Sequence, residues 1–315
     1  MGKTIEIVRY TPEKASEWNE FVASSKNGTF LFDRQYMDYH SDRFADHSLM
    51  FYREHELYAL LPANQKDGML MTHQGLTYGG LVMGESATVE EIGQCFRLLN
   101  NYLKANAFES VVYKAIPWIY HRQPAEEDLY ALVQVSHAHL SVRHVSSAIY
   151  LPSPIRWRRD HRYGAGKSVA GGVVVQRSDD YESFWTILSD NLCHKYGATP
   201  VHTLEEMRLL HSRFPDHIRL YTATSDDIVI GGTVLYLCGH TAHAQYISAS
   251  PEGKRRHAID AIFDHVLHHE LKGFRYFDFG KSSNGDGEDL NATLVSQKEG
   301  YGARAICYDW YQWQP

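Results

Sequence analysis

The sequence predicts an α+β protein that consists of two copies of one domain, and three observations lead to this prediction. The chain has 315 residues, which is large for a single hydrophobic core and suits two domains. Residues 40–52, HSDRFADHSLMFY, recur in shortened form as residues 211–221, HSRFPDHIRLY. The segments that flank the two copies show the same succession of helical and strand-like apolar periods. The alternative is one irregular domain with accidental internal similarity.

In each half the predicted order is helix, helix, strand, strand, strand, helix, strand. Thr11-Pro12 and the Ser-Asp-Asp run at 178–180 mark the first helix of each half, and apolar residues follow at helical spacing. The first half continues with a helix near 36–40, a strand that ends near 52, strands at 57–62 and 69–74, a helix at 89–104 and a strand at 110–114. The second half continues with a helix near 204–210, a strand that ends near 221, strands at 228–237 and 243–248, a helix at 254–271 and a strand at 274–279. The predicted domains are residues 1–150 and residues 173–315.

Residues 151–172 are predicted to be a basic linker between the two domains. Arginine and lysine alternate there with Trp157 and Tyr163, which fits either a solvated connector or an arm that contacts an anion. The Gly-Lys-Ser at 166–168 resembles the end of a phosphate-binding loop. That motif requires a glycine five positions earlier, where His161 stands, and a helix afterwards, where an apolar strand begins at 173. A nucleotide phosphate loop is therefore excluded.

Composition and charge exclude several classes of function. The net charge of −7 and the isoelectric point near 6.2 argue against a general DNA or RNA coat. The four cysteines are far apart, which predicts buried thiols in a reducing compartment. No apolar signal core and no apolar run of about 18 residues occurs, so we expect a cytoplasmic protein without a membrane span. His265 and His269 lack the His-Glu-x-x-His spacing of zinc proteases, and no metal is predicted.

Three stretches of the second half carry a resemblance to a known family. They are GFRYFDFGKSS at 273–283, LVSQKEGYGAR at 294–304, and GGTVLYL, which follows TATSDDIVI. Together with the element order they resemble the GNAT acyltransferases, and two such halves in one chain resemble the Fem-type (FemAB-like) transferases. The resemblance implies two tandem GNAT-like domains, each a mixed and mostly antiparallel sheet flanked by helices. Asp-Phe-Gly at 278–280 is also a kinase motif, but the glycine-rich loop, the Val-Ala-Ile-Lys strand and the His-Arg-Asp of kinases are missing.

The resemblance implies acyl transfer to an amine. In the GNAT fold two neighbouring parallel strands splay apart, the acyl donor lies in the gap, and a backbone N–H binds the reacting carbonyl. By position the splayed strands are those at 243–248 and 274–279. Donor phosphates would lie on the N-terminus of the helix that begins near 254, where N–H groups and the helix dipole favour anions. The implied donor-binding residues are Ser248, Gly253, Lys254, Arg255 and Arg256.

The donor itself is left open by a departure from the family pattern. Acetyl-CoA users carry Arg or Gln, two residues, Gly, one residue, then Gly or Ala, and in residues 250–258 either register places an arginine where glycine is required. Acetyl-CoA or another acyl-CoA is preferred, because the chain does not show the long helical arm that cell-wall Fem enzymes use with tRNA. The alternatives are charged tRNA with a peptidoglycan precursor as acceptor, or an inactive module that binds a nucleotide-sugar or a peptide. The expected acceptor is an amine on a small molecule, peptide or sugar, and no DNA partner is expected.

The resemblance also implies three catalytic candidates. Lys298 would lie near the acyl carbonyl and stabilise the tetrahedral intermediate. Asp278 would position or deprotonate the amine, and Tyr246 would protonate the leaving group. The alternatives are a surface lysine, an aspartate that caps a loop at the end of a strand, and a tyrosine of the core.

Overall fold

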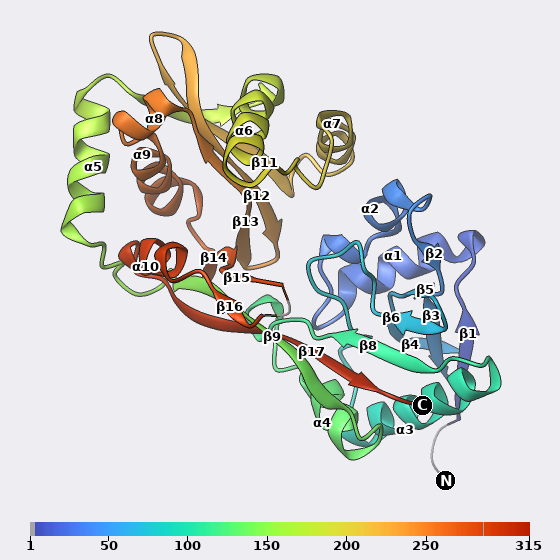
Figure 1. The fold of residues 1–315 in the computed structure, drawn as a ribbon. Coiled ribbons are helices and arrows are strands. Elements are labelled where there is room, and N and C mark those ends of the chain that lie inside the picture. The colour runs from blue at the N-terminus through green and yellow to red at the C-terminus, as the bar shows by residue number, and fades with distance from the viewer. Residues whose placement is uncertain (1–3, 286) are drawn as a thin grey trace. The chain divides into compact units, whose positions relative to one another are not determined.

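The computed structural model describes residues 4–285 and 287–315, and the chain divides into two compact units. Unit 1 consists of Met1–Val145, Ser283–Leu290 and Cys307–Pro315, and unit 2 of Ser146–Ser282 and Asn291–Ile306. Strand β9 (His139–Tyr150) begins in unit 1 and ends in unit 2, whereas β17 (Arg304–Trp313) begins in unit 2 and ends in unit 1 (Figure 1).

Unit 1 contains two sets of strands flanked by helices. β1 (Ile5–Arg9), β3 (Leu49–Arg53), β4 (Glu56–Leu61) and β7 (Val82–Met83) form an antiparallel sheet in that order. β2 (Ala45–Asp46), β5 (Asn64–Lys66), β6 (Met69–Met71), β8 (Ser110–Lys114) and the C-terminal part of β17 form the second set, in which only the described pair β6 and β8 is parallel. The helices are α1 (Ala15–Ser24), α2 (Arg34–Met37), α3 (Val89–Ala105) and α4 (Glu127–Gln134), with short 3₁₀ turns at Pro12–Lys14, Phe30–Phe32, Asp38–His40 and Trp118–Tyr120, and a small hairpin of β15 (Ser283–Asn284) and β16 (Asp289–Leu290).

Unit 2 contains one sheet in the order β10 (Val174–Ser178), β11 (Ile218–Ser225), β12 (Ile228–Cys238), β13 (Thr241–Ala249), β14 (Tyr276–Lys281) and the C-terminal part of β9. Among these described strands the pair β13 and β14 is parallel, and the others are antiparallel. The helices are α5 (Arg159–Ala170), α6 (Tyr181–Tyr196), α7 (Leu204–Arg213), α8 (Pro251–Arg255), α9 (Ala258–His265), the π-helical turn Val266–Glu270, and α10 (Ala292–Gly300). The predicted α+β class with mixed, mostly antiparallel sheets is confirmed.

The two units repeat one succession of elements, from β1 to β8 in the first and from β10 to β14 in the second. Each central helix buries a stripe at helical spacing, such as Ile92, Phe96, Leu99 and Leu103 of α3, against its own core. Strands β1, β9 and β17 and helices α4, α5 and α10 lie outside the elements predicted from the sequence. Helix α5 falls within residues 151–172, the predicted linker, and it packs on α9 in unit 2 (Figure 1).

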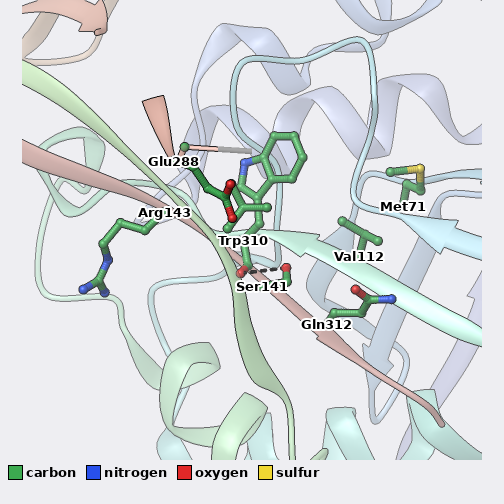
Figure 2. Close-up of a pocket in the computed structure, with 9 residues that line it drawn as sticks. Met71, Val112, Ser141, Arg143, Glu288, Trp310 and Gln312 are labelled. Atoms are coloured by element: carbon green, nitrogen blue, oxygen red, sulfur yellow. Dashed lines mark hydrogen bonds between the residues drawn. The ribbon is translucent and has the colours of Figure 1, made fainter. Parts of the chain in front are cut away.

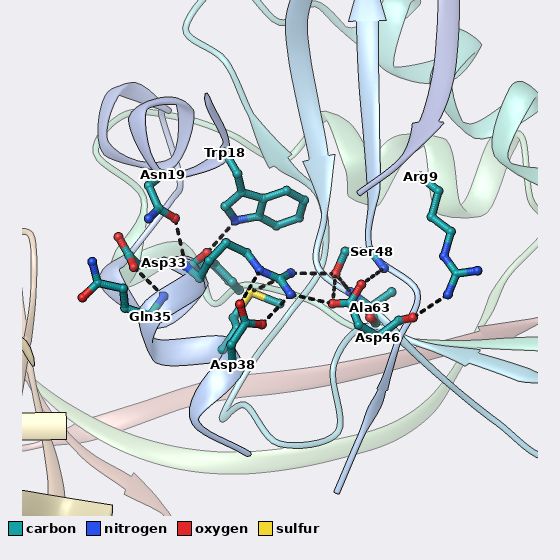
Figure 3. Close-up of polar contacts among 12 residues, drawn as sticks. Arg9, Trp18, Asn19, Asp33, Gln35, Asp38, Asp46, Ser48 and Ala63 are labelled. Atoms are coloured by element: carbon teal, nitrogen blue, oxygen red, sulfur yellow. Dashed lines mark hydrogen bonds and ion pairs between the residues drawn. The ribbon is translucent and has the colours of Figure 1, made fainter. Parts of the chain in front are cut away.

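A buried arginine, Arg34, joins the first helices and strands of unit 1 through Asp38, Asp46 and Ser48, which Figure 3 labels. The guanidinium of Arg34 is ion-paired with Asp38 at 2.5 Å and with Asp46 at 2.9 Å, and it donates to the hydroxyl of Ser48. It lies 3.8 Å from the ring centroid of Tyr10. With two carboxylates and an aromatic face around it, this cation is fully compensated, so we interpret the cluster as structural.

Candidate functional site

The strands β13 and β14 of unit 2 part along their length, as the family resemblance implies. They pair in parallel over three residues each, from Thr241 opposite Tyr276 to His243 opposite Asp278. Beyond that point β13 stays on β12, whereas β14 follows β9 through a register shift between Asp278 and Lys281. Gly280 lies in this shift with a φ of +77°, a conformation that glycine adopts without strain. The Asp-Phe-Gly stretch therefore bends β14 away from its neighbour.

A cavity of about 330 Å³ lies where the strands part. Its walls come from β13, β14 and from helices α6, α8, α9 and α10. The residues that line it are Leu188, Asn191, Leu192, Lys195, Ile247, Ser248, Ala249, Lys254, Ile259, Phe263, Phe279, Leu294, Gln297, Lys298 and Tyr301. Among these described lining residues there are three lysines and no carboxylate, so the cavity favours an anionic or carbonyl-bearing ligand with an apolar part.

Backbone N–H groups of β13 face this gap. Ser250 donates its N–H to the carbonyl of Ile230 on β12 at 2.9 Å, and the register continues with Ser248 opposite Gly232. Alternate residues of an antiparallel ladder turn their N–H groups to opposite sides. Ile247 and Ala249 therefore direct theirs away from β12 and toward the cavity that both residues line. These two N–H groups are placed to donate to a carbonyl oxygen in the gap.

Lys298 lies in the wall of the cavity and is 5% exposed. Its Nζ donates to the carbonyls of Gly280 at 2.7 Å and Lys281 at 3.1 Å, and to the hydroxyl of Ser282 at 2.7 Å. Burial lowers the pKa of Lys298 to about 8, while the nearby Asp278 carboxylate opposes the shift. The lysine thus supplies a positive charge beside the cavity. It also binds the end of β14 that turns away from β13.

Asp278 lies on the other face of β14 from Phe279, since neighbouring side chains of a strand point to opposite faces. It is completely buried, and its carboxylate accepts hydrogen bonds from the hydroxyl of Ser146 at 2.5 Å, from His243 Nδ1 at 2.9 Å and from the N–H of Gly280 at 3.1 Å. His243 and Ser146 were not predicted as site residues. Their signal is positional, because His243 stands opposite Asp278 at the last pair before the strands part.

Of the remaining predicted residues, Ser248 and Lys254 line the cavity, whereas Tyr246, Gly253, Arg255 and Arg256 are not among its described lining residues. The hydroxyl of Tyr246 is bonded to His202 Nδ1 at 2.6 Å, and burial raises the pKa of Tyr246 to about 12. A role for Tyr246 as a proton donor stays a proposal that requires this contact to open.

Most polar groups of the predicted phosphate-binding turn, residues 250–256, bond to other groups of the same turn. The N–H of Gly253 is capped by the hydroxyl of Ser250 at 3.1 Å, and both arginines of the basic run are ion-paired with Glu252. A Cβ at Gly253 would lie 2.0 Å from the carbonyl oxygen of Ile230, so this glycine serves packing against β12. Lys254 lines the cavity, and its Nζ donates to Asn191 at 2.8 Å.

In unit 1 the parallel pair is β6 and β8, and a tyrosine follows its last residue pair. β6 and β8 pair from Met69 opposite Ser110 to Met71 opposite Val112, which places Val112 where unit 2 has Asp278. The hydroxyl of Tyr113 accepts the N–H of Leu81 at 2.7 Å and donates to Asp128 at 2.5 Å. The cavity between the parted strands and all the residues predicted for catalysis or donor binding lie in unit 2, so we place the candidate site there.

A separate, more open hollow of about 590 Å³ lies in unit 1 on strands β6, β8, β9 and β17 (Figure 2). Trp310, Gln312, Glu288 and Ser141 line it, and the hydroxyl of Ser141 donates to the carbonyl of Trp310 at 3.1 Å. None of the residues predicted for catalysis or donor binding is among the described residues that line it.

Comparisons with known proteins agree with this geometry. Residues 156–288 match the family model of the acetyltransferase (GNAT) domain. The crystal structure of FemX is similar with a TM-score of 0.69 and 11% identity, over 98% of this chain and 97% of that chain. The structure of L-PGS from Bacillus licheniformis is similar with a TM-score of 0.61 and 10% identity, over 96% of this chain and 91% of that chain. A tandem GNAT protein from the clavulanic acid biosynthesis pathway is similar with a TM-score of 0.53 and 13% identity, over 99% and 98% of the two chains.

These structural matches confirm the fold that the resemblance predicts. A sequence comparison with curated proteins finds no significant match. In the described part of the chain, no helix has both the length and the apolar character needed to cross a lipid bilayer.

Proposed function

We propose that the chain is an N-acyltransferase that moves an acyl group from a thioester or ester donor onto an amine, with the site in unit 2. The observation that carries this proposal is the parting of β13 and β14 around a cavity that two backbone N–H groups face. The GNAT match over residues 156–288 covers these strands and supports the same chemistry.

In the proposed reaction the donor carbonyl lies in the gap and accepts the N–H groups of Ile247 and Ala249. The amine attacks the carbonyl carbon, and the two N–H groups stabilise the oxyanion that forms. The ammonium of Lys298 adds positive charge next to this position. The intermediate then collapses, the thiolate or alkoxide leaves, and the attacking nitrogen loses a proton to the leaving group or to water.

We propose an acyl-CoA as the donor, because Lys195 and Lys254 bring positive charge to a cavity with an apolar interior. A second candidate is aminoacyl-tRNA, and one observation favours it. Glu252 stands in the first turn of α8 with its carboxylate on both neighbouring arginines, which disfavours a diphosphate at that turn. The acceptor is an amine on a small molecule, peptide or sugar, and the cytoplasm is the proposed compartment.

The test is a transfer assay with both donor classes. The purified chain is incubated with radiolabelled acetyl-CoA, with longer acyl-CoAs and with charged tRNA, each with a library of amines, and labelled amide is separated and counted. We expect Lys298→Met to lower turnover by about a hundredfold or more. Lys66→Met, an exposed site on β5, is the matched control and should leave turnover unchanged. Binding of a ligand without transfer from any donor would identify a binding module instead.

A further inference from the structure

The stretch HRYGAGKS, which resembles a phosphate loop, lies in helix α5 and has a packing role. His161, Gly164, Ala165 and Ser168 are its buried residues, at spacings of three, four and seven from the first. This is the stripe by which a helix packs on a neighbour, and the neighbour is α9. Gly166 and Lys167 of the same helix are exposed.

A buried carboxylate joins α5, α9 and α10. Asp260 of α9 is 8% exposed. Its Oδ1 is bonded to His161 Nδ1 at 2.7 Å and accepts the hydroxyl of Tyr301 at 2.5 Å, and its Oδ2 is bonded to His257 Nδ1 at 3.2 Å. The rings of His161 and Tyr301 also stack, with their centroids 3.9 Å apart. A buried carboxylate on α9 that is bonded to α5 and to the residue after α10 fixes the relative positions of the three helices.

Two glycines permit this close approach. A Cβ at Gly164 would lie 2.2 Å from Asp260 Oδ2 and 2.8 Å from His257 Nδ1. A Cβ at Gly300, the last residue of α10, would lie 2.7 Å from Arg158 Nε and 2.7 Å from His161 Nε2. By contrast, nothing lies within 4 Å of a Cβ at Gly166.

The same turn of α5 also holds α10 directly. The N–H of Arg158 donates to the carbonyl of Gly300 at 2.7 Å, and its guanidinium donates to the hydroxyl of Ser296 at 3.2 Å. Helix α10 carries Lys298, and Tyr301 follows its end, so that both line the cavity. The Tyr301 ring stacks on Phe279 of β14 with the centroids 5.7 Å apart.

We propose that the start of α5 is a clamp, formed by Arg158, His161 and Gly164 on Asp260, that positions α10 and so keeps Lys298 and Tyr301 in the cavity wall. These are positioning residues and do not touch the acyl group. The proposal rests on the proposed function only for the statement that Lys298 assists transfer, and the placement of Lys298 can be tested without it.

The experiment compares Gly164→Ala with Gly166→Ala, the same change two residues apart in one helix. In Gly164→Ala the new methyl group displaces Asp260 from its three partners. We expect amide hydrogen exchange in residues 292–301, and modification of Lys298 by an amine-reactive reagent, to accelerate by about tenfold. Gly166→Ala should leave both rates at the wild-type value. Equal rates in wild type and both folded variants would overturn the clamp.

A second pair of variants covers the case in which Gly164→Ala fails to fold. His161→Asn keeps a donor near the position of Nδ1 and should retain slow Lys298 modification, whereas His161→Leu removes the donor and should accelerate it. Equal modification rates in the two would also overturn the proposal. If transfer is detected, His161→Leu should lower kcat about tenfold with KM little changed, and His161→Asn should restore kcat. Faster modification in a chain that transfers nothing supports the clamp and refutes the proposed function.

Discussion

The charge of Lys298 should set the upper pH limit of acyl transfer. Burial lowers its pKa from the ordinary 10.5 to about 8, which corresponds to a cost of roughly 3 kcal/mol for keeping the ammonium in the fold. The three acceptors around Nζ retain the cation at neutral pH. Because the cation is the active form, it is present below pH 8 and is lost as the pH rises through that value. The contribution of Lys298 to the rate should then fall about tenfold for each further pH unit.

The assay compares wild type with Lys298→Arg between pH 6.5 and 9.5, because a guanidinium stays charged over this range. The attacking amine also loses its proton as the pH rises, so the quantity to follow is the ratio of the two rates, in which this effect cancels. We expect the ratio of wild type to Lys298→Arg to be constant below pH 7.5 and to fall above pH 8. A ratio that stays level to pH 9.5 would show that the ionisation of Lys298 plays no part in the reaction.

Three further predictions concern stability, each measured by urea unfolding. Gly280→Ala should cost about 1–2 kcal/mol, because φ is +77° there and the new Cβ would lie 3.2 Å from His243 Cε1; an unchanged midpoint would argue against strain at the bend. Arg34→Met should cost about 1–3 kcal/mol, because it removes the buried cation that pairs with Asp38 and Asp46, whose side chains are 44% and 30% exposed, and a neutral effect would contradict the structural role of the cluster. Burial raises the pKa of Asp128 from 3.8 to about 7, so its contribution to stability is complete below pH 4 and is lost as the pH rises to 7. The decline over this range, at most about 4 kcal/mol, should disappear in Asp128→Asn, and the same decline in both proteins would refute the assignment.

The local elements of the fold and of the site could be predicted from the sequence. The apolar periodicity indicates the strands at 243–248 and 274–279, which part in the structure as β13 and β14. Gly280 within Asp-Phe-Gly is the residue that bends β14. Strands β9 and β17 were not predicted, because apolar and polar residues occur on both faces of each strand and give no regular alternation. Their partner strands are also distant in sequence. His243 was not predicted as a site residue for a related reason. A sequence indicates that two strands are neighbours, but the register decides that His243 stands opposite Asp278.

The expected phosphate site shows how local charge pairs compete with a ligand. The basic run at 254–256 was predicted to bind phosphates, yet Glu252 stands three and four residues before its two arginines and is ion-paired with both. Ion pairs at this spacing form on one face of a helix without any bound ligand. Glu252 was therefore the signal in the sequence that both arginines are already ion-paired. Lys254 lies between Glu252 and the arginines in sequence, and it lines the cavity.

The two units repeat one succession of elements, but the residue after the last parallel pair differs between them. Tyr113 and Phe279 each follow the last parallel pair of their strand. Phe279 offers only an apolar edge, and it lines the cavity with Tyr301. Tyr113 instead joins the N–H of Leu81 to the carboxyl of Asp128. Removing that hydroxyl would take one partner from the N–H of Leu81 and one from the Asp128 carboxyl, whose other oxygen accepts the N–H of Leu129 at 2.9 Å, so the contact is lost only at a cost. Duplication of the sheet therefore does not imply duplication of the site, because the apolar residue that lines the cavity of unit 2 is replaced in unit 1 by a tyrosine whose hydroxyl is engaged with a backbone N–H and a carboxyl.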